Sequence, residues 1–490
     1  MLLTSYNIYC SSLIKYGLCF PLSGALSDCS QNVWLLSWDA ADEKAPFLRN
    51  EPVKLTPAWE GTNLPNDTLN LKGIAMDLAP PKDKWNLIFL TLLLHGLGTL
   101  TAWNMFITAK DYFVKYKLEN APEYSEHFLA YVGWASQIPN LFFSWFNVFV
   151  RTGGNLTTRI VWSLMIEVAI FVATVVLAMV DSSEWPGAFF WLTMILVFFI
   201  NGFNAIFQNS VYGVAARLPP SYTGAVVLGS NICGTLVVFL NWSSEFFESV
   251  RTAAIYYFIG GMFVLLICFD TYFALPLNRF YRYHDTLQQR TMQANPALAA
   301  TNGAAKEHIP YGAIFRKTAV QLYNVFFTFF VSLAVYPSVN SDILPNMPGF
   351  LGTNFTRLTC FLTFNLTAML GNISASLFQY PTRRWLWVFT TLRVAFIPFF
   401  LLCNYKPDVR TLPVLITNDW VYWIGAMLLG WTSGHGSSLG MMYVGGGVAP
   451  EHSATAGMIG AAMLVTGIMM GITFTRLCPI IVTMELWRGM

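Results

Sequence analysis

The sequence predicts an all-α polytopic membrane protein with about eleven transmembrane helices, and three observations support this prediction. The 490-residue chain is 55% hydrophobic but only 11% charged, whereas a soluble domain has about 25% charged residues. Apolar segments of about 20 residues, the length that a helix needs to cross a bilayer, recur along the chain. One long basic interruption, from Leu277 to Pro310, divides these segments into six and five. Two helical bundles joined by a basic linker are typical of transporters.

The first predicted span, Trp85 to Ala109, contains no Asp, Glu, Lys or Arg, but it does contain His95 and Asn104. An unpaired polar group in hydrocarbon costs several kcal/mol, so Asn104 needs a partner on another helix or on a passing solute. The ten further spans are expected at roughly 128–150, 159–180, 186–212, 222–243, 252–275, 313–338, 355–378, 385–405, 420–443 and 456–482.

Loop charges and sequons predict how the chain is oriented in the membrane. Lys and Arg are more frequent in the loops that share a side with the N-terminus, which favours a cytoplasmic N-terminus. No clear secretory signal opens the chain, and an alternative start at Met76 stays open. The sequons at Asn241 and Asn354 fall on the outer side and predict a glycoprotein. With this orientation the spans predict five regions along the chain. They are a flexible cytoplasmic tail (1–84), a six-helix bundle (85–276), a cytoplasmic linker (277–312), a five-helix bundle (313–482) and a short extracellular tail (483–490).

Amide side chains recur inside the spans. Asn201, Asn204 and Gln208 have the spacing i, i+3, i+7, which places them on one face of a helix. Such a stripe suits a heterocyclic base or a sugar, and the alternative is hydrogen bonding between helices. Gln137 directly precedes the turn that contains Pro139, so it lines a cavity or satisfies the backbone carbonyl that the proline frees.

Three of the charged side chains inside the predicted spans are candidates for function. Glu167 is the clearest intramembrane carboxylate, a kind of group that is rare and usually functional. It could form an ion pair, relay a proton or bind a cation, and Arg159 lies eight residues before it, near the same face. Arg159 is also close enough to the membrane boundary to contact lipid headgroups. Arg393, inside the ninth span, requires an anionic or carbonyl partner.

In the second half, Asn365 and Asn372 share a face of the eighth span. His435 lies among serines and glycines in the tenth and is expected to be hydrogen-bonded, with titration as the alternative. Gly467 and Gly471 in the last span, and Gly224, Gly229 and Gly234 in the fifth, predict close helix packing. We find no metalloprotease, nucleophile-elbow, Walker or dinucleotide motif, so we expect no enzyme activity, no catalytic residue, no metal site and no cofactor.

Several motifs of this chain resemble those of the equilibrative nucleoside transporters. Residues 96–113, GLGTLTAWNMFITAKDYF, are similar to the first-span signature GxGxLxPWNxFxTAxxYF, with Ala102 at the proline position. Further matches lie at 200–226, 393–407 and 454–461. The resemblance runs from about Pro81 to the C-terminus. It implies eleven spans in a major-facilitator-like fold and movement of nucleosides, or in some members nucleobases, by alternating access.

The resemblance also implies roles for particular residues. Trp103 and Asn104 would lie at the central cavity, Gln208 would meet the base, and Arg159 would belong to the gating network. The eighth span departs from the family pattern FNxxDxxGR, because Ala368 and Asn372 stand where the ribose-binding Asp and Arg are expected. Losing both charges leaves neither stranded, so folding is spared, but hydrogen bonds that discriminate for a hydroxylated sugar are lost.

We therefore expect a facilitative transporter of nucleosides or nucleobases. The alternatives are a diverged, proton-coupled or uncoupled carrier of another small solute such as an organic cation, and a transport-inactive sensor or scaffold. The expected partners are a small-molecule substrate and the lipid bilayer of the plasma membrane or an internal membrane, with no nucleic acid. The expected substrate-binding residues are Trp103, Asn104, Gln137, Asn204, Gln208, Asn365 and Asn372, with Arg159, Glu167 and Arg393 forming a gating network.

Overall fold

The computed structural model describes residues 81–484, apart from 111, 120, 126–127, 151–155, 245, 295–308, 348, 350 and 353–354. The tail before Pro81 with its alternative start at Met76, most of the linker loop, the sequon at Asn354 and the last six residues lie outside the described residues. The described residues form helices without an extended strand, and one isolated β-bridge joins Ile343 to Tyr405. The all-α prediction is confirmed.

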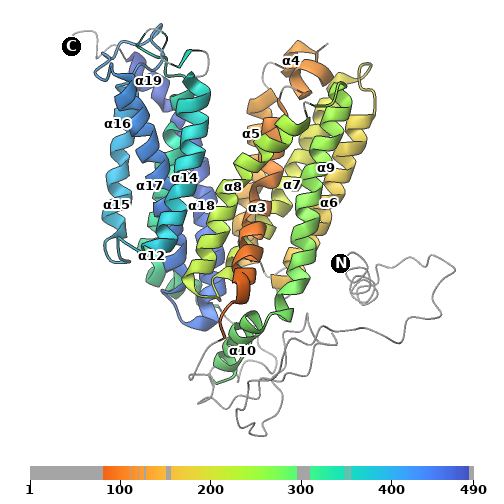
Figure 1. Ribbon diagram of the computed structural model, residues 1–490, viewed down its shortest axis with the longest axis vertical. Coiled ribbons are helices and arrows are strands. Elements are labelled where there is room, and N and C mark those ends of the chain that lie inside the picture. Colours follow the sequence, from red (N-terminus) through yellow and green to blue (C-terminus); the bar gives the residue numbers. More distant parts are fainter. Residues whose placement is uncertain are drawn as a thin grey trace, which may run out of the picture. The chain divides into compact units, whose positions relative to one another are not determined.

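Six long helices make up the first half of the described chain, which we call the first helix group (Figure 1). They begin and end within a few residues of the predicted spans. The six helices are α3 (Leu87–Thr108), α5 (Phe128–Phe149), α6 (Leu156–Met179), α7 (Pro186–Ala215), α8 (Pro220–Ser244) and α9 (Val250–Ala274). Of the two sequons, the one at Asn241 is described, and it lies in the last turn of α8.

The second helix group follows the amphipathic helix α10 (Arg279–Ala294). Its ninth predicted span is interrupted by a 3₁₀ turn, Arg393–Ala395, and ends at Leu401 instead of residue 405. The turn precedes Pro398, whose ring clashes with the carbonyl four residues earlier and disturbs a helix there. The members of this group are α12 (Tyr311–Val335), α14 (Thr363–Leu377), α15 (Leu386–Leu392), α16 (Phe396–Leu401), α17 (Asp419–Gly445), α18 (Ser453–Thr475) and α19 (Leu477–Thr483).

Seven helical stretches of the described chain are long and apolar enough to cross a membrane. The apolar segment Leu386–Leu401 is shorter. Helices α5, α8 and α17, with 22, 25 and 27 residues, also have the length of a span but are not among these seven. A multi-pass membrane protein is therefore confirmed, and the count of eleven spans stays a prediction.

Close backbone contacts at glycines hold neighbouring helices together, as the small-residue stripes predicted. In the first helix group, Gly229 of α8 lies directly against the carbonyl of Leu93 in α3. In the second, a methyl group at Gly471 of α18 would lie 2.6 Å from the carbonyl oxygen of Phe330 in α12. Small residues permit such contacts because no side chain separates the two backbones.

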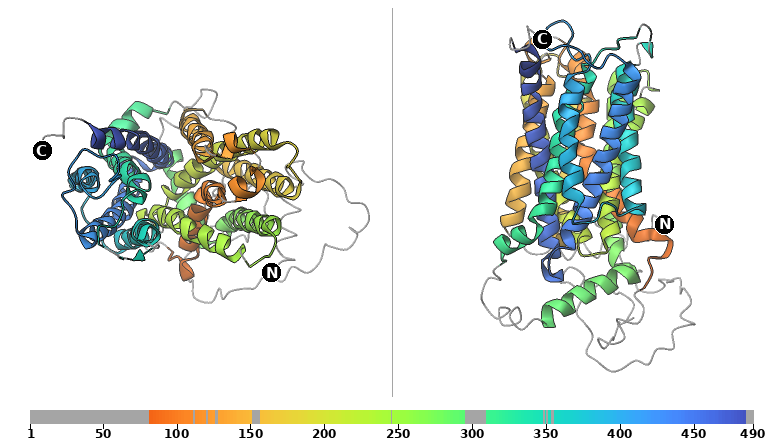
Figure 2. Two further views of the ribbon diagram at one scale, coloured as in Figure 1. Left: turned by 90° about the horizontal axis from the view of Figure 1, so that it is seen from above. Right: turned by 90° about the vertical axis from the view of Figure 1, so that its left-hand side faces the viewer.

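The two helix groups approach each other most closely at the end that carries α10, opposite the end that carries α4 (Pro122–Ser125) (Figures 1 and 2). A methyl group at Gly457 of α18 would lie 2.6 Å from the carbonyl oxygen of Tyr212 in α7. A contact between α5 and α18 also exists nearer the other end, where the guanidinium carbon of Arg476 lies 4.8 Å from the centre of the Trp134 ring. Contacts between the backbones of the two groups therefore concentrate at the α10 end.

Candidate functional site

Helix α3 presents Trp103 and Asn104 in its last two turns, both half-buried. Asn104 Nδ2 donates to the carbonyl of Leu100 in its own helix at 3.0 Å and lies 3.6 Å from Sγ of Cys233 in α8. Its Oδ1 accepts no hydrogen bond from any described residue. The amide predicted at the cavity therefore uses its donor within the protein and keeps its acceptor available.

The amide stripe of α7 divides into three different situations. Asn201 Nδ2 donates to the carbonyl of Val197 in its own helix at 2.8 Å. Asn204 Nδ2 donates to the carbonyl of Thr99 in α3 at 2.7 Å, so it joins two helices. Gln208 is only 3% exposed, yet it makes no hydrogen bond to any described residue. Helix-to-helix bonding therefore accounts for Nδ2 of Asn204, but it accounts neither for Oδ1 of Asn204 nor for Gln208.

Helix α5 contributes Gln137, and it also carries a polar contact that sequence reasoning missed. Gln137 is 5% exposed, and its Oε1 has no described partner. Further along, Asn209 of α7 donates through Nδ2 to the carbonyl of Ser144 at 2.7 Å. Asn147 Nδ2 donates to the carbonyl of Ile206 at 3.3 Å. Asn147 and Asn209 each interrupt an apolar span, which is a signal in the sequence. They lie on different helices, so no helical spacing connects them.

Arg159 joins three helices near the α10 end. Its Nη1 donates to both the backbone carbonyl and Oδ1 of Asn147 in α5, each at 2.9 Å. The same atom lies 4.0 Å from Sδ of Met458 in α18, which belongs to the second helix group. Arg159 is therefore positioned where the two groups meet, in keeping with a gating role.

Glu167 is completely buried in α6, and neither carboxyl oxygen has a hydrogen-bond partner among the described residues. The alternative of an ion pair with Arg159 is wrong in this structure, since no described cation bonds to the carboxyl. Burying an ionised carboxylate without a partner costs far more than burying the neutral acid. The buried Glu167 carboxyl is therefore left without a described partner that would stabilise its charge.

Asn365 of α14 lies beside α8 of the first helix group. It is half-buried, and a methyl group at Gly234 of α8 would lie 3.6 Å from its Oδ1. The neighbouring Cys233 is the residue that Asn104 of α3 approaches. One turn of α8 therefore lies between Asn104 and Asn365, and this turn links the two halves of the predicted site.

The two substituted positions of α14 lie against α17. Asn372 is fully buried, and its Oδ1 accepts a hydrogen bond from Ser438 Oγ at 2.9 Å. Ala368 is 2% exposed, and its carbonyl lies directly against Gly434. No contact among the described residues brings Asn372 to Gln208 or Asn104, and its Nδ2 has no described partner. The structure therefore gathers Asn104 and Asn365 around α8 and leaves Asn372 in the α14–α17 contact.

Two polar residues of the second helix group are satisfied internally. Arg393 is 2% exposed, and its Nη1 donates to the carbonyl of Thr328 in α12 at 2.7 Å, so its partner is a carbonyl as expected. His435 lies between Oγ of Ser374 and the carbonyl of Tyr380, with both ring nitrogens at 2.7 Å from their partners. A carbonyl only accepts, so Nε2 carries the proton.

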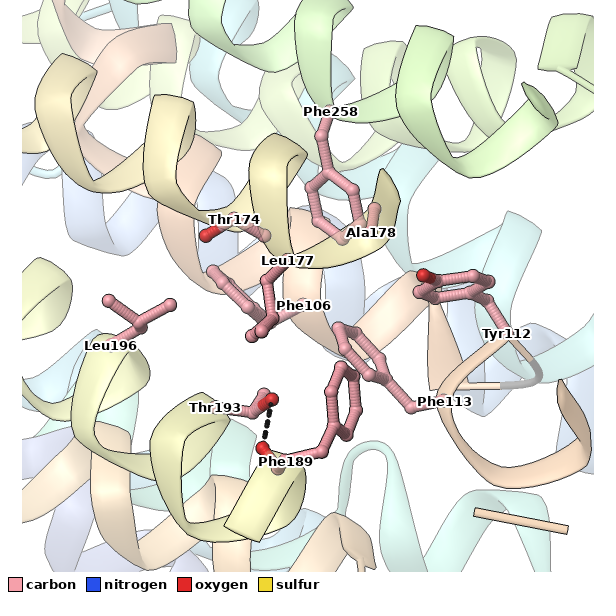
Figure 3. Close-up of a pocket in the computed structure, with 10 residues that line it drawn as sticks. All are labelled: Phe106, Tyr112, Phe113, Thr174, Leu177, Ala178, Phe189, Thr193, Leu196 and Phe258. Atoms are coloured by element: carbon pink, nitrogen blue, oxygen red, sulfur yellow. Dashed lines mark hydrogen bonds between the residues drawn. The ribbon is translucent and has the colours of Figure 1, made fainter. Parts of the chain in front are cut away.

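An enclosed pocket inside the first helix group is too small for a solute (Figure 3). Its volume is about 10 Å³, which is close to the room needed for one water. Aromatic rings, among them Phe106, Phe113, Phe189 and Phe258, line it. The hydroxyl of Thr193 does not serve it, because it donates to the carbonyl of Phe189 at 2.8 Å. This region is a packed aromatic core.

Comparison with known proteins matches the chain to one family. The family model described as "Nucleoside transporter" matches residues 194–478. The chain is 28% identical to equilibrative nucleoside transporter 1 of Homo sapiens, across 82% of this chain and 99% of that protein. It is 30% identical to equilibrative nucleoside transporter 3 of Rattus norvegicus, across 78% of this chain and 86% of that protein.

A solved structure resembles the fold at low sequence identity. The proton:xylose symporter XylE of the major facilitator superfamily aligns with a TM-score of 0.55 and 12% identity, covering 81% of this chain and 88% of that one. At this identity the likeness concerns the fold alone. It confirms the major-facilitator-like architecture that the sequence motifs predicted.

Proposed function

This chain belongs to the equilibrative nucleoside transporter family, and from this premise we propose that it carries nucleosides and nucleobases across a membrane by facilitated diffusion. The substrate would bind between the two helix groups, which rock about it to give alternating access. Trp103, Asn104, Gln137, Asn204, Gln208 and Asn365 are the proposed binding residues. Asn372 keeps a supporting role, because Ser438 engages its amide oxygen and only its Nδ2 has no described partner.

The unbonded amide of Gln208 is the observation that supports this proposal best. A buried polar group without a partner costs about 1–3 kcal/mol. The amide of a glutamine offers both a donor and an acceptor, which is the pattern that the edge of a purine or pyrimidine base requires. A base bound at this position would satisfy the amide and offset the cost of burying it.

We further propose that the α10 end is cytoplasmic and that this arrangement opens toward the opposite side. The predicted excess of Lys and Arg in the loops at the α10 end supports the orientation. The close backbone contact at Gly457 supports a closed inner gate beside Arg159. The plasma membrane is the proposed location.

Uptake of radiolabelled adenosine, uridine and hypoxanthine in a transporter-deficient host tests the proposal. We expect saturable uptake, and an organic cation is included to detect a diverged substrate. Gln208→Ala should raise the half-saturation concentration about twofold to tenfold, the equivalent of one hydrogen bond. Asn201→Ala is the matched control, because Asn201 bonds only within its own helix. No uptake of any solute at normal surface expression would instead favour a sensor or scaffold.

Glu167 supports a second candidate, in which transport is coupled to protons. A fully buried carboxyl with no partner can gain and lose a proton if one conformation exposes it. Under coupling, uptake rises at acidic pH, and Glu167→Gln abolishes this rise while protein abundance is retained. Uptake that is independent of pH in both forms would leave Glu167 without a coupling role.

A further inference from the structure

A groove of about 470 Å³ lies between the two helix groups near the α10 end. Both groups contribute to its walls, so it exists only where α5 lies beside α12 and α18. Two hydrogen bonds join the same helices, from Tyr311 Oη to the carbonyl of Val148 and from Trp145 Nε1 to Thr466 Oγ1, each at 3.0 Å. The lining residues include Trp145 and Phe149 of α5, Tyr311, Phe315 and Arg316 of α12, and Ile459 of α18.

The aromatic rings of the groove face outward from the helices. Phe149 is 56% exposed and Phe315 is 44% exposed. Both lie in an end turn of their helices, and α12 is among those apolar enough to span a bilayer. Trp and Tyr side chains are enriched at the level of the lipid headgroups, and Trp145 and Tyr311 line the groove beside these two phenylalanines. The position therefore fits an amphipathic occupant with one end in the hydrocarbon region.

The charge of the groove is one-sided. Arg316 and Lys317 are the only charged residues of α5, α12 and α18. Neither forms an ion pair with a described residue, and no acidic side chain occurs on these three helices. A guanidinium binds a phosphate through two parallel hydrogen bonds, and an unopposed pair of cations favours an anion.

We propose that this groove binds an anionic phospholipid. The lipid phosphate binds the Arg316 guanidinium, Lys317 adds a second positive charge, and an acyl chain lies along the rings of Phe149 and Phe315. Under the proposed orientation the groove faces the cytoplasmic leaflet, where anionic lipids are concentrated. Because the walls come from both helix groups, a bound lipid stabilises the arrangement in which α5 contacts α12 and α18.

Native mass spectrometry of the full-length protein, titrated with phosphatidylserine or phosphatidylcholine, tests the proposal. We expect the unmodified protein to retain phosphatidylserine preferentially. Arg316→Gln with Lys317→Gln should weaken this binding about tenfold, as expected for losing charged phosphate contacts. The control is Lys82→Gln with Lys84→Gln, which removes two exposed lysines at the same end of the molecule.

A second pair of variants tests the groove by shape. No atom lies within 4 Å of a methyl group placed at Gly312, a lining residue, so Gly312→Trp fills the groove without meeting the backbone. Gly133→Trp is the matched control, because the space around this α5 glycine is equally open but outside the groove. We expect Gly312→Trp alone to reduce phosphatidylserine binding.

Equal retention of the two lipids by the unmodified protein would overturn the proposal, as would unchanged phosphatidylserine binding in both the Arg316/Lys317 and the Gly312 variants. Lipid binding is measured without uptake, so this result is independent of whether nucleosides are the substrate.

Discussion

The two halves of the predicted substrate site treat their polar side chains differently. In the first helix group, Gln208 has no hydrogen-bond partner among the described residues, and Oδ1 of Asn204 has none either. In the second, the amide oxygen of Asn372 accepts from Ser438 while its Nδ2 has no described partner, and Arg393 donates to a backbone carbonyl. The first group therefore presents more polar groups that a solute can satisfy, whereas the second uses most of its own to join helices.

This difference gives the substituted positions of α14 a physical meaning. Charged side chains at residues 368 and 372 would each need a partner, which is the opposite charge, a ligand or solvent, because isolated charges are costly to bury. Here Ala368 and Asn372 lie in the close contact between α14 and α17. Recognition is therefore expected to depend on the first helix group, which favours contacts with the base over contacts with the ribose.

Introducing a charge into α14 should have the largest effect and would break this comparison most directly. Asn372 is fully buried, so Asn372→Arg places an unpaired cation between packed helices and should destabilise the protein by about 3–5 kcal/mol. Ala368→Asp together with Asn372→Arg should recover part of this loss, because the charges then pair. Thermal unfolding in detergent with both single variants as controls measures the effect.

A gain in uridine affinity by the double variant at unchanged thermal stability would contradict this interpretation. It would mean that residues 368 and 372 face the substrate in the transport cycle, and that this chain has lost ribose recognition without repacking α14.

Asn372→Ala should have an intermediate effect and sharpen the comparison. The variant leaves the hydroxyl of Ser438 without its acceptor, so we expect a loss of about 1–3 kcal/mol in the free energy of unfolding. Uptake per molecule at the surface should stay unchanged, because the side chain serves helix packing. Ser438→Ala with Asn372→Ala is the control, and it should cost less than the sum of the two single changes. A lower uptake rate at normal stability would assign Asn372 to the substrate.

The helices could be predicted because the bilayer imposes a length and a composition on each span. Close packing at Gly229 and Gly471 could be predicted too, since a glycine stripe has few other uses in a membrane helix. The interruption of the ninth span at Arg393 was not predicted. Pro398 signalled a disturbance, but where the helix changes to a 3₁₀ turn depends on the contacts of Arg393 with α12.

The polar site was less predictable. Helical spacing specifies which residues share a face of one helix, but not which residues of another helix that face contacts. Asn204 and Gln208 lie on one face, yet only Asn204 reaches the carbonyl of Thr99 in α3. The sequence singled out Arg159 but did not identify its partner Asn147, because the partner is on a different helix. Glu167 suggested an ion pair by its spacing from Arg159, and three-dimensional packing directs the two side chains to different surroundings.

A substitution in the first helix group, Gln208→Leu, should cause the smallest change in stability, and it tests the same comparison between the two helix groups. Gln208→Leu removes an amide that forms no hydrogen bond with any described residue and replaces it with an apolar side chain of similar size. Removing a buried polar group that lacks a partner relieves its desolvation cost, so the melting temperature should stay the same or rise slightly. Asn204→Leu is the matched comparison on the same helix, and it should lower the melting temperature, because its bond to Thr99 of α3 is lost. Equal destabilisation by the two changes would show that Gln208 serves helix packing, and uptake would then have to be explained without it.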